Sequence, residues 1–290
     1  MLATSTLQTP SLTTPTPSWK ARLELEFARG PHGSLLSKRM HHGPLRVQKA
    51  LYPEGEEICH AIIIHPPAGI AGGDVLDIDV HLHQASHAVL STPSATKWYK
   101  SAGNPATQSV HFRLDARAKL DWLPQENLFF NASFAELNTT FDLEPGASFI
   151  AWDAFMLGRK ASAEEWKNGS VKTDTRIKIG GQLIWLEKGC LDAQNNWVNS
   201  LPQMGGWPIV STLLAVGSNC SAQVAEQLAQ FMPWTDRLRA GITYLQQGVL
   251  VARIVSSDME LTRALQIEIW SKLRPLVHGV EAQPLRLWAS

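Results

Sequence analysis

Apolar and polar residues alternate along much of this chain, and this pattern constrains its fold more than any other feature. Over residues 22–27, Leu23, Leu25 and Phe27 would share one face of an extended strand, and residues 76–82 repeat the pattern. Further strands are predicted, with Gly, Pro and Asn between them, over residues 110–114, 120–123, 149–153, 171–179, 183–187 and 249–255. The pattern indicates a mainly β protein.

A weak internal repeat suggests how these strands are arranged. In each frame a small residue is followed two positions later by a larger apolar one, and the frames begin at Ala88, Ala118, Ala147 and Gly181. A spacing of roughly thirty residues is typical of a β-solenoid, in which successive coils stack and bury apolar surface that a single coil would leave exposed. A β-sandwich would give shorter and less regular spacings. We therefore predict a β-helical stack of strands.

Two helices are predicted, both in the C-terminal third. The first covers residues 221–231, with Ser221 as its N-terminal cap and Pro233 after its end. The second begins near Asp258, and Pro275 is expected to end it. Its buried face is an i, i+4 stripe of Leu261, Leu265, Ile269 and Leu273.

Composition divides the chain into a tail and one domain. Residues 1–18 are rich in Thr, Ser and Pro and lack the apolar core of a secretory signal, so we expect a disordered tail. Residues 19–290 are expected to form a single domain.

Charge and cysteine content exclude several classes of function. The chain has 26 Lys and Arg against 26 Asp and Glu, so no global field favours nucleic acid or an anionic membrane. Cys59, Cys190 and Cys220 lie far apart and form no CxxC pair, which disfavours a zinc ribbon or a disulfide framework. The uncharged residues 193–225 contain no apolar run long enough to span a bilayer. We expect a cytoplasmic protein that binds neither nucleic acid nor membrane.

Several ordered motifs run along the chain, at residues 43–48, 65–74, 92–99, 122–126 and 157–159. Together they resemble the UreD (UreH) family of urease accessory proteins over roughly residues 19–290. One departure is Ala68, which stands where the family usually has glycine.

This resemblance implies a β-helical protein with two helices that catalyses no reaction itself. It implies a urease maturation factor that binds apo-urease together with UreF and the GTPase UreG, with a homodimer allowed within that complex. It also implies that no cofactor is tightly bound and that nickel passes transiently through the interior of the protein.

Two acids occupy equivalent places in the repeat, because Asp153 and Glu187 each lie six positions after the start of a frame. If the frames are stacked coils, the two residues are inward-pointing neighbours on adjacent rungs, roughly 5 Å apart in backbone. Buried carboxylates are costly unless they are protonated, paired, hydrated or liganded. The resemblance implies that they line a nickel channel, and a structural pairing of each acid with Arg or Lys remains the alternative.

Other side chains could support such a path. Asp74 follows two glycines that allow close backbone approach, although the same loop would serve as a simple turn. Lys97 and Arg159 could pair with the acids or orient loops, and they could equally be solvated.

Histidines offer further ligands. His81 and His83 share one strand face with other polar residues, so they could capture metal at the surface or simply face solvent. His60 and His65 flank an apolar run, where hydrogen-bonded structural histidines are favoured over ligands.

A second class of function is a β-helical carbohydrate-active enzyme that uses the paired carboxylates as acid and base. It would need an open groove, whereas ion passage needs an enclosed polar interior. The chain contains no P-loop, GxGxxG, HExxH or GxSxG motif. Nucleotide hydrolysis is therefore assigned to a partner.

Overall fold

The computed structural model describes residues 18–195, 199–200 and 204–289. Apart from Ser18, the predicted tail lies outside these residues.

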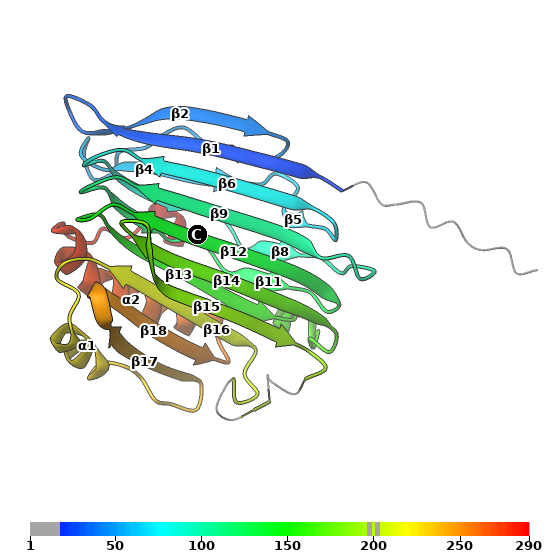
Figure 1. Cartoon of the computed structure of the whole chain (residues 1–290). Coiled ribbons are helices and arrows are strands. Elements are labelled where there is room, and N and C mark those ends of the chain that lie inside the picture. The colour runs from blue at the N-terminus through cyan, green and yellow to red at the C-terminus, as the bar shows by residue number, and fades with distance from the viewer. Residues whose placement is uncertain (1–17, 196–198, 201–203, 290) are drawn as a thin grey trace, which may run out of the picture.

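Two β-sheets form the body of the protein (Figure 1). In order across the seven-stranded sheet, the strands are β15 (Gln182–Asp192), β14 (Gly169–Ile179), β12 (Ser133–Leu143), β9 (Ala106–Leu114), β6 (Val75–Leu82), β1 (Lys20–Arg29) and β2 (Ser34–His42). The main path of the eleven-stranded sheet is β17 (Leu238–Leu245), β18 (Val249–Ser256), β16 (Ile209–Val216), β13 (Ser148–Leu157), β10 (Lys119–Trp122), β7 (His87–Ser91), β4 (Cys59–Ile64) and β3 (Arg46–Val47). Three short strands of this sheet pair beside that path, namely β11 (Asn127–Phe129), β8 (Thr96–Trp98) and β5 (Gly69–Ile70).

From β4 to β14 the chain winds between the two sheets as stacked coils. Strands from successive coils pair in parallel, so that Cys59, Ala88, Leu120 and Phe149 occupy one register in the eleven-stranded sheet. These positions are roughly thirty residues apart, as the solenoid prediction required. The predicted mainly β, solenoid-like stack is confirmed.

The frames of the predicted repeat are only partly aligned. Leu120 pairs with Phe149, so the frames at Ala118 and Ala147 are in register, whereas Leu120 pairs with Ala88 itself and that frame is shifted by two residues. A shift of two residues keeps the same side chains pointing inward, because side chains alternate along a strand.

The frame at Gly181 was wrong. Strand β15 is not a further coil; it folds back on β14 as an antiparallel hairpin within the seven-stranded sheet. Ile179 pairs with Gln182 across Gly180 and Gly181, whose φ angles are 56° and 78°. Two consecutive residues with positive φ form the tight turn that joins antiparallel strands, so this glycine pair reverses the chain.

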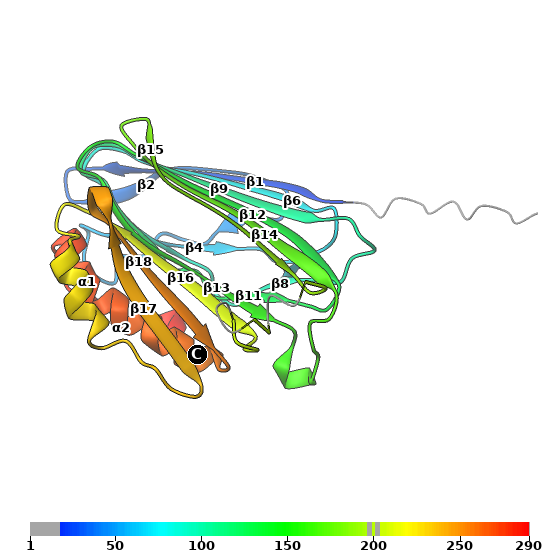
Figure 2. The same ribbon diagram turned by 60° about the horizontal axis from the view of Figure 1, so that its bottom comes forward.

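Alternation along β13 shows how the eleven-stranded sheet separates two hydrophobic clusters. Phe149 and Ala151 belong to the cluster between the two sheets, whereas Ile150 and Trp152 belong to the cluster beneath the helices. Figure 2 shows the sheets as two layers, with the helices on the side of the eleven-stranded sheet away from its partner. One sheet therefore carries two buried faces.

Helix α1 (Ala222–Ala229) and helix α2 (Met259–His278) lie in the C-terminal third, as predicted. The Ser221 side chain caps α1 by accepting a hydrogen bond from the Val224 amide, and Asp258 caps α2 by accepting from Glu260 and Leu261. Short 3₁₀ turns lie at Lys160–Ser162, Gln246–Gly248 and Arg286–Ala289.

The prediction that Pro275 ends the second helix was wrong, because α2 continues to His278 and ends at Gly279, whose φ is 70°. A proline within the last turn removes one hydrogen bond, and here the tertiary contacts of the neighbouring residues hold the turn in place.

Those contacts form a buried polar cluster, the Asp121 network, which consists of Glu54, His60, His87, Asp121, Arg274 and His278. The Arg274 guanidinium donates to both Glu54 oxygens at 2.6 and 2.9 Å and to Asp121 at 3.3 Å. Burial disfavours the charged form of Asp121, but the charge interaction with His278, the hydrogen bond with His87 and the charge of Arg274 hold its pKa below the usual range. The network fastens α2 to the sheet.

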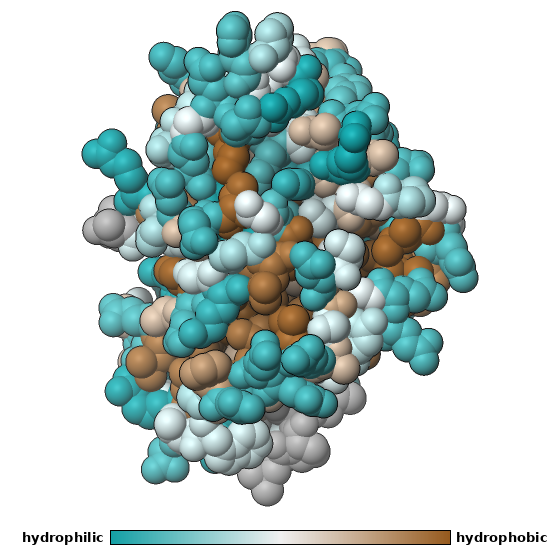
Figure 3. Space-filling view, turned by 90° about the vertical axis from the view of Figure 1, so that its left-hand side faces the viewer, coloured by the Kyte–Doolittle hydropathy of each residue, from teal (hydrophilic) through white to brown (hydrophobic). Residues whose placement is uncertain are grey.

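Figure 3 views the molecule from the side on which α1 lies in Figure 1 and shows apolar surface broken up by polar side chains. Among the described residues, no helix is both long enough and apolar enough to cross a bilayer.

Replacing Arg274 should test the role of the Asp121 network. Arg274→Met leaves two buried carboxylates without their cation, so the free energy of unfolding should fall by about 3–5 kcal/mol. Arg263→Met, on the same helix, breaks the partly exposed pair with Glu126 and should cost only about 0–1 kcal/mol. Urea denaturation of both variants measures the difference, and equal losses would contradict a special role for the network.

Candidate functional site

A cavity of about 280 Å³ lies between the two sheets near β15 and β18, and we call it the inter-sheet cavity. Both predicted acids, Asp153 and Glu187, line it, together with Arg253. The remaining wall is mostly apolar, with polar contributions from threonine and serine hydroxyl groups.

Strand register explains why the polar side chains gather there. Thr175 pairs with Thr139 on one side and with Glu187 on the other, which makes one polar row across the seven-stranded sheet. A second row crosses the eleven-stranded sheet, where Thr212 pairs with both Asp153 and Arg253. All the members of the two rows line the inter-sheet cavity.

An ion pair joins the two rows. The Arg253 guanidinium contacts the Glu187 carboxylate at 2.5 Å and donates to the Thr212 hydroxyl at 2.6 Å. Glu187 therefore has the basic partner that the structural-pair alternative described, although both side chains of this pair are partly exposed. A partly exposed pair of this kind can exchange partners at low cost.

Asp153 is the unpaired acid of the site. Among the described residues, none forms a hydrogen bond or an ion pair with its carboxylate, although part of the side chain is exposed. Burial raises the pKa of Asp153 to about 7. The exposed part of the Asp153 side chain faces the cavity rather than bulk solvent. The side chain can therefore be partly exposed while its carboxylate is strongly desolvated. At neutral pH this carboxyl group is poised between its protonated and its charged form.

The prediction that Asp153 and Glu187 are neighbours on adjacent rungs was wrong. Asp153 lies on β13 and pairs with Thr212, whereas Glu187 lies on β15 in the other sheet and pairs with Thr175. The error follows from the hairpin described above, which places β15 outside the coil stack. The two acids instead line one cavity from opposite sheets.

A second cavity of about 400 Å³, the loop-lined cavity, meets the first at Asp153 and Trp122, which line both. It follows the breaks between β4 and β5, between β7 and β8, and between β10 and β11. Residues 63–69, 92–96 and 124–127 contribute to its wall. Three of the ordered sequence motifs thus lie in equivalent loops of successive coils and lead toward Asp153.

Asp74, Lys97 and Arg159 lie outside the walls of both cavities. The two Asp74 oxygens accept hydrogen bonds from the Trp19 amide at 2.8 Å and from the Ala71 amide at 2.9 Å, an arrangement that fastens its own loop. Arg159 pairs with Glu164 rather than with the predicted acids. Lys97 is half-buried on β8 and forms no ion pair with a described residue.

The predicted histidines lie in three different parts of the structure. His60 is buried and contacts Glu54 at 2.7 Å, so it belongs to the Asp121 network. His65 lines the loop-lined cavity, where burial lowers its pKa and favours the neutral imidazole. His81 lies on the outward face of β6, and His83 follows that strand; both are partly exposed.

Two features of the site were missed by sequence reasoning. Arg253 lies at an inward position of β18 beside Val251, and a charged residue within an apolar period-2 run was the available signal. The Asp121 network also had a signal, because Gln266, Trp270, Arg274 and His278 form a second i, i+4 row along α2, and all four are buried.

The inter-sheet cavity provides oxygen ligands without a fixed cage. Carboxylate, hydroxyl and water oxygens bind divalent cations less firmly than a set of thiolates or imidazoles does. Cys190 also lines this cavity, but it is exposed and lies on the edge strand β15. The arrangement is suited to transient binding of a hydrated cation.

Comparison with known proteins identifies the family. The family model described as "UreD urease accessory protein" matches residues 20–289. Proteins named urease accessory protein UreD are similar to this chain over almost its whole length. The relative from Polynucleobacter asymbioticus is 59% identical over 94% of this chain and 94% of its own, and that from Ralstonia nicotianae is 50% identical over 94% and 95%. The relative from Bordetella pertussis is 41% identical over 94% of this chain and 98% of its own. This chain therefore belongs to the UreD family of urease accessory proteins.

Proposed function

We propose that this protein acts in urease maturation as a non-catalytic scaffold that binds apo-urease together with UreF and the GTPase UreG. In this proposal nickel is cargo that passes through the loop-lined cavity and the inter-sheet cavity toward urease. Membership of the UreD family supports the maturation role. The observation that carries nickel passage is the position of Asp153, which lines both cavities.

The polar groups that line the two cavities change along the proposed route. The loop-lined cavity offers neutral polar groups, among them His65, Gln125 and Asn127. Asp153 stands at the junction, and Glu187 with Arg253 lies further along the inter-sheet cavity. A cation that leaves bulk water would meet its first wholly unpaired carboxylate at the junction.

Two competitors keep binding along this route reversible. A proton competes for Asp153, because the raised pKa keeps this group partly protonated at neutral pH. Arg253 competes for Glu187, because the guanidinium already neutralises that carboxylate. A cation must displace each competitor, so neither acid holds it as firmly as a free carboxylate in an apolar pocket would.

The location of the acids favours this reading over a carbohydrate-active enzyme. A glycosidase needs its two carboxyl groups at a groove that admits a sugar chain. Here Asp153 lines two partly open cavities, and Glu187 is already paired with Arg253, so only one unpaired carboxyl group is present where the reaction needs two. This geometry supports ion passage.

Removing both acids should separate transport from assembly. The double substitution Asp153→Ala and Glu187→Ala deletes the carboxylates of the cavity without touching an outer face. Co-purification with UreF, UreG and apo-urease should persist, while the nickel content and activity of the urease fall by roughly ten-fold or more. Glu136→Ala is the matched control, because Glu136 is a partly exposed acid on β12 that pairs with Lys172. Unchanged nickel loading in the double variant would refute passage through this cavity.

The raised pKa of Asp153 predicts a pH-dependent stability difference. Between pH 3.8, the ordinary pKa, and about 7, the folded state keeps a proton that the unfolded state releases, so the stability of the wild-type protein falls as the pH rises. Asp153→Asn removes this term. The variant should therefore gain stability relative to wild type across this window and change no further above about pH 7.

Urea denaturation at pH 4, 6 and 8 measures this difference. Glu136→Gln, the same kind of substitution at a partly exposed acid on β12, is measured alongside as the control. A constant offset for Asp153→Asn over the same range would show that the carboxyl group titrates normally.

A further inference from the structure

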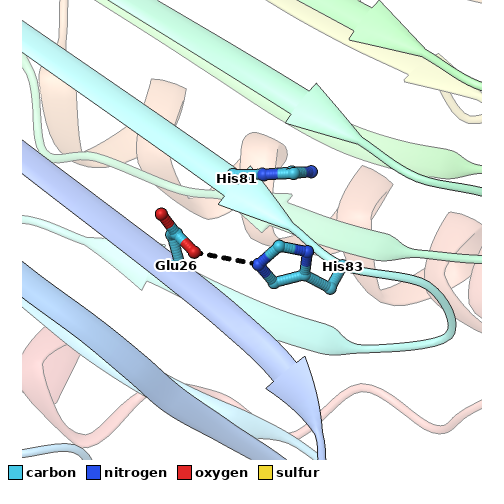
Figure 4. Close-up of side chains that lie close together, drawn as sticks. All are labelled: Glu26, His81 and His83. Atoms are coloured by element: carbon cyan, nitrogen blue, oxygen red, sulfur yellow. Dashed lines mark hydrogen bonds and ion pairs between the residues drawn. The ribbon is translucent and has the colours of Figure 1, made fainter.

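A second group of metal-type ligands lies on the outer face of the seven-stranded sheet, away from the cavities. It consists of Glu26 from β1, His81 from β6 and His83, which directly follows β6 (Figure 4). All three side chains are partly exposed, with 29%, 25% and 37% of their surface accessible. A cation could therefore reach them from solvent.

Strand pairing brings these residues together. Glu26 and His81 are direct neighbours across the parallel pair of β1 and β6. The His83 amide continues that pairing by donating to the Phe27 carbonyl at 2.8 Å. The two imidazole rings lie 4.1 Å apart between centroids, and Nε2 of His83 contacts Glu26 at 3.0 Å. The backbone thus fixes the group without help from a flexible loop.

The spacing of the ligand atoms is close to that of a bound ion. One ligand atom from each residue lies within 4.8 Å of the other two. Three ligands bound to one ion by bonds of about 2.1 Å lie about 3.4–3.6 Å from one another. The partly exposed side chains can rotate to reach this spacing.

Asp115, which follows β9, orients both rings. One of its carboxylate oxygens contacts Nε2 of His81 at 2.9 Å, and the other contacts Nδ1 of His83 at 3.5 Å. Metal-binding histidines commonly use their second ring nitrogen to contact a carboxylate in this way, which fixes the tautomer and the ring orientation. Asp115 leaves Nδ1 of His81 and Nε2 of His83 as the nitrogens directed away from it.

We propose that Glu26, His81 and His83 form a binding site for a divalent transition-metal ion of the Ni²⁺, Zn²⁺ or Cu²⁺ type. Two imidazoles and one carboxylate suit ions of borderline softness and disfavour Mg²⁺ and Ca²⁺, which require more oxygen ligands. An incoming ion replaces the hydrogen bond between His83 and Glu26.

Nearby charge limits the affinity of this site. The Lys38 ammonium contacts the other Glu26 oxygen at 3.0 Å, so it competes with the ion for the carboxylate. We therefore expect exchangeable rather than permanent binding. The buried group of His87, Asp121 and His278 also has metal-type ligands, but there the Arg274 guanidinium already supplies the positive charge.

Equilibrium dialysis of the full chain against Ni²⁺ and, separately, Zn²⁺ tests the site. The double substitution His81→Ala and His83→Ala should lower the affinity by roughly ten-fold or more or remove one bound ion per chain, and Glu26→Gln should have a smaller effect. Asp115→Asn should also weaken binding, although Asp115 need not touch the ion. His111→Ala is the matched control, because His111 is a partly exposed histidine on the neighbouring strand β9 and lies outside the group.

Two outcomes would overturn the proposal. Binding that is unchanged in the double variant would remove the site, and an equal loss in His111→Ala would reduce it to general binding by surface imidazoles. Paramagnetic broadening of the His81 and His83 ring protons by Ni²⁺, assigned with single variants, provides a direct readout. The variant lacking Asp153 and Glu187 should keep this broadening, so failure of the outer site and failure of nickel passage can be told apart.

Discussion

Burial of alternate side chains between two facing sheets is the constraint on which this structure depends. Every strand of the coils turns one set of side chains inward, and most of those positions are filled by one hydrophobic cluster. A polar residue at an inward position must be paired, hydrated or uncharged. Glu187 is paired with Arg253, and Asp153 retains its proton more readily than usual. The chemistry of the cavity thus follows from the geometry of the fold.

The outer faces of the two sheets carry different chemistry. The outer face of the seven-stranded sheet is solvated, and Glu26, His81 and His83 gather there. The outer face of the eleven-stranded sheet is covered by α2, and its polar residues, centred on Asp121 and Arg274, are joined in a buried network. Because side chains alternate along each strand, the residues directly before and after an inward acid lie beneath a helix or face the solvent.

Period-2 alternation and helix capping predicted the strands and both helices, because these signals are local. The repeat of roughly thirty residues predicted that the strands stack as a solenoid. The frame at Gly181 was misassigned because its spacing fitted a further coil, although Gly180 and Gly181 are a typical hairpin signal that joins β15 to the strand directly before it. For the site, alternation predicted that Asp153 is directed inward, but it could not identify Arg253 as the partner of Glu187, 66 residues away. Pairing across sheets depends on register that no single segment of sequence encodes.

Each of the two sheets ends at both edges in a strand that runs antiparallel to its neighbour. The outermost strands β2 and β15 of one sheet, and β3 and β17 of the other, each run antiparallel to their neighbours. A parallel coil therefore cannot simply be appended at either end of the solenoid. A longer stack would require the insertion of a whole coil in the middle, which would move the surrounding rungs apart by about 4.8 Å. The length of the stack therefore changes only in whole rungs, whereas point substitutions change the side chains that line it.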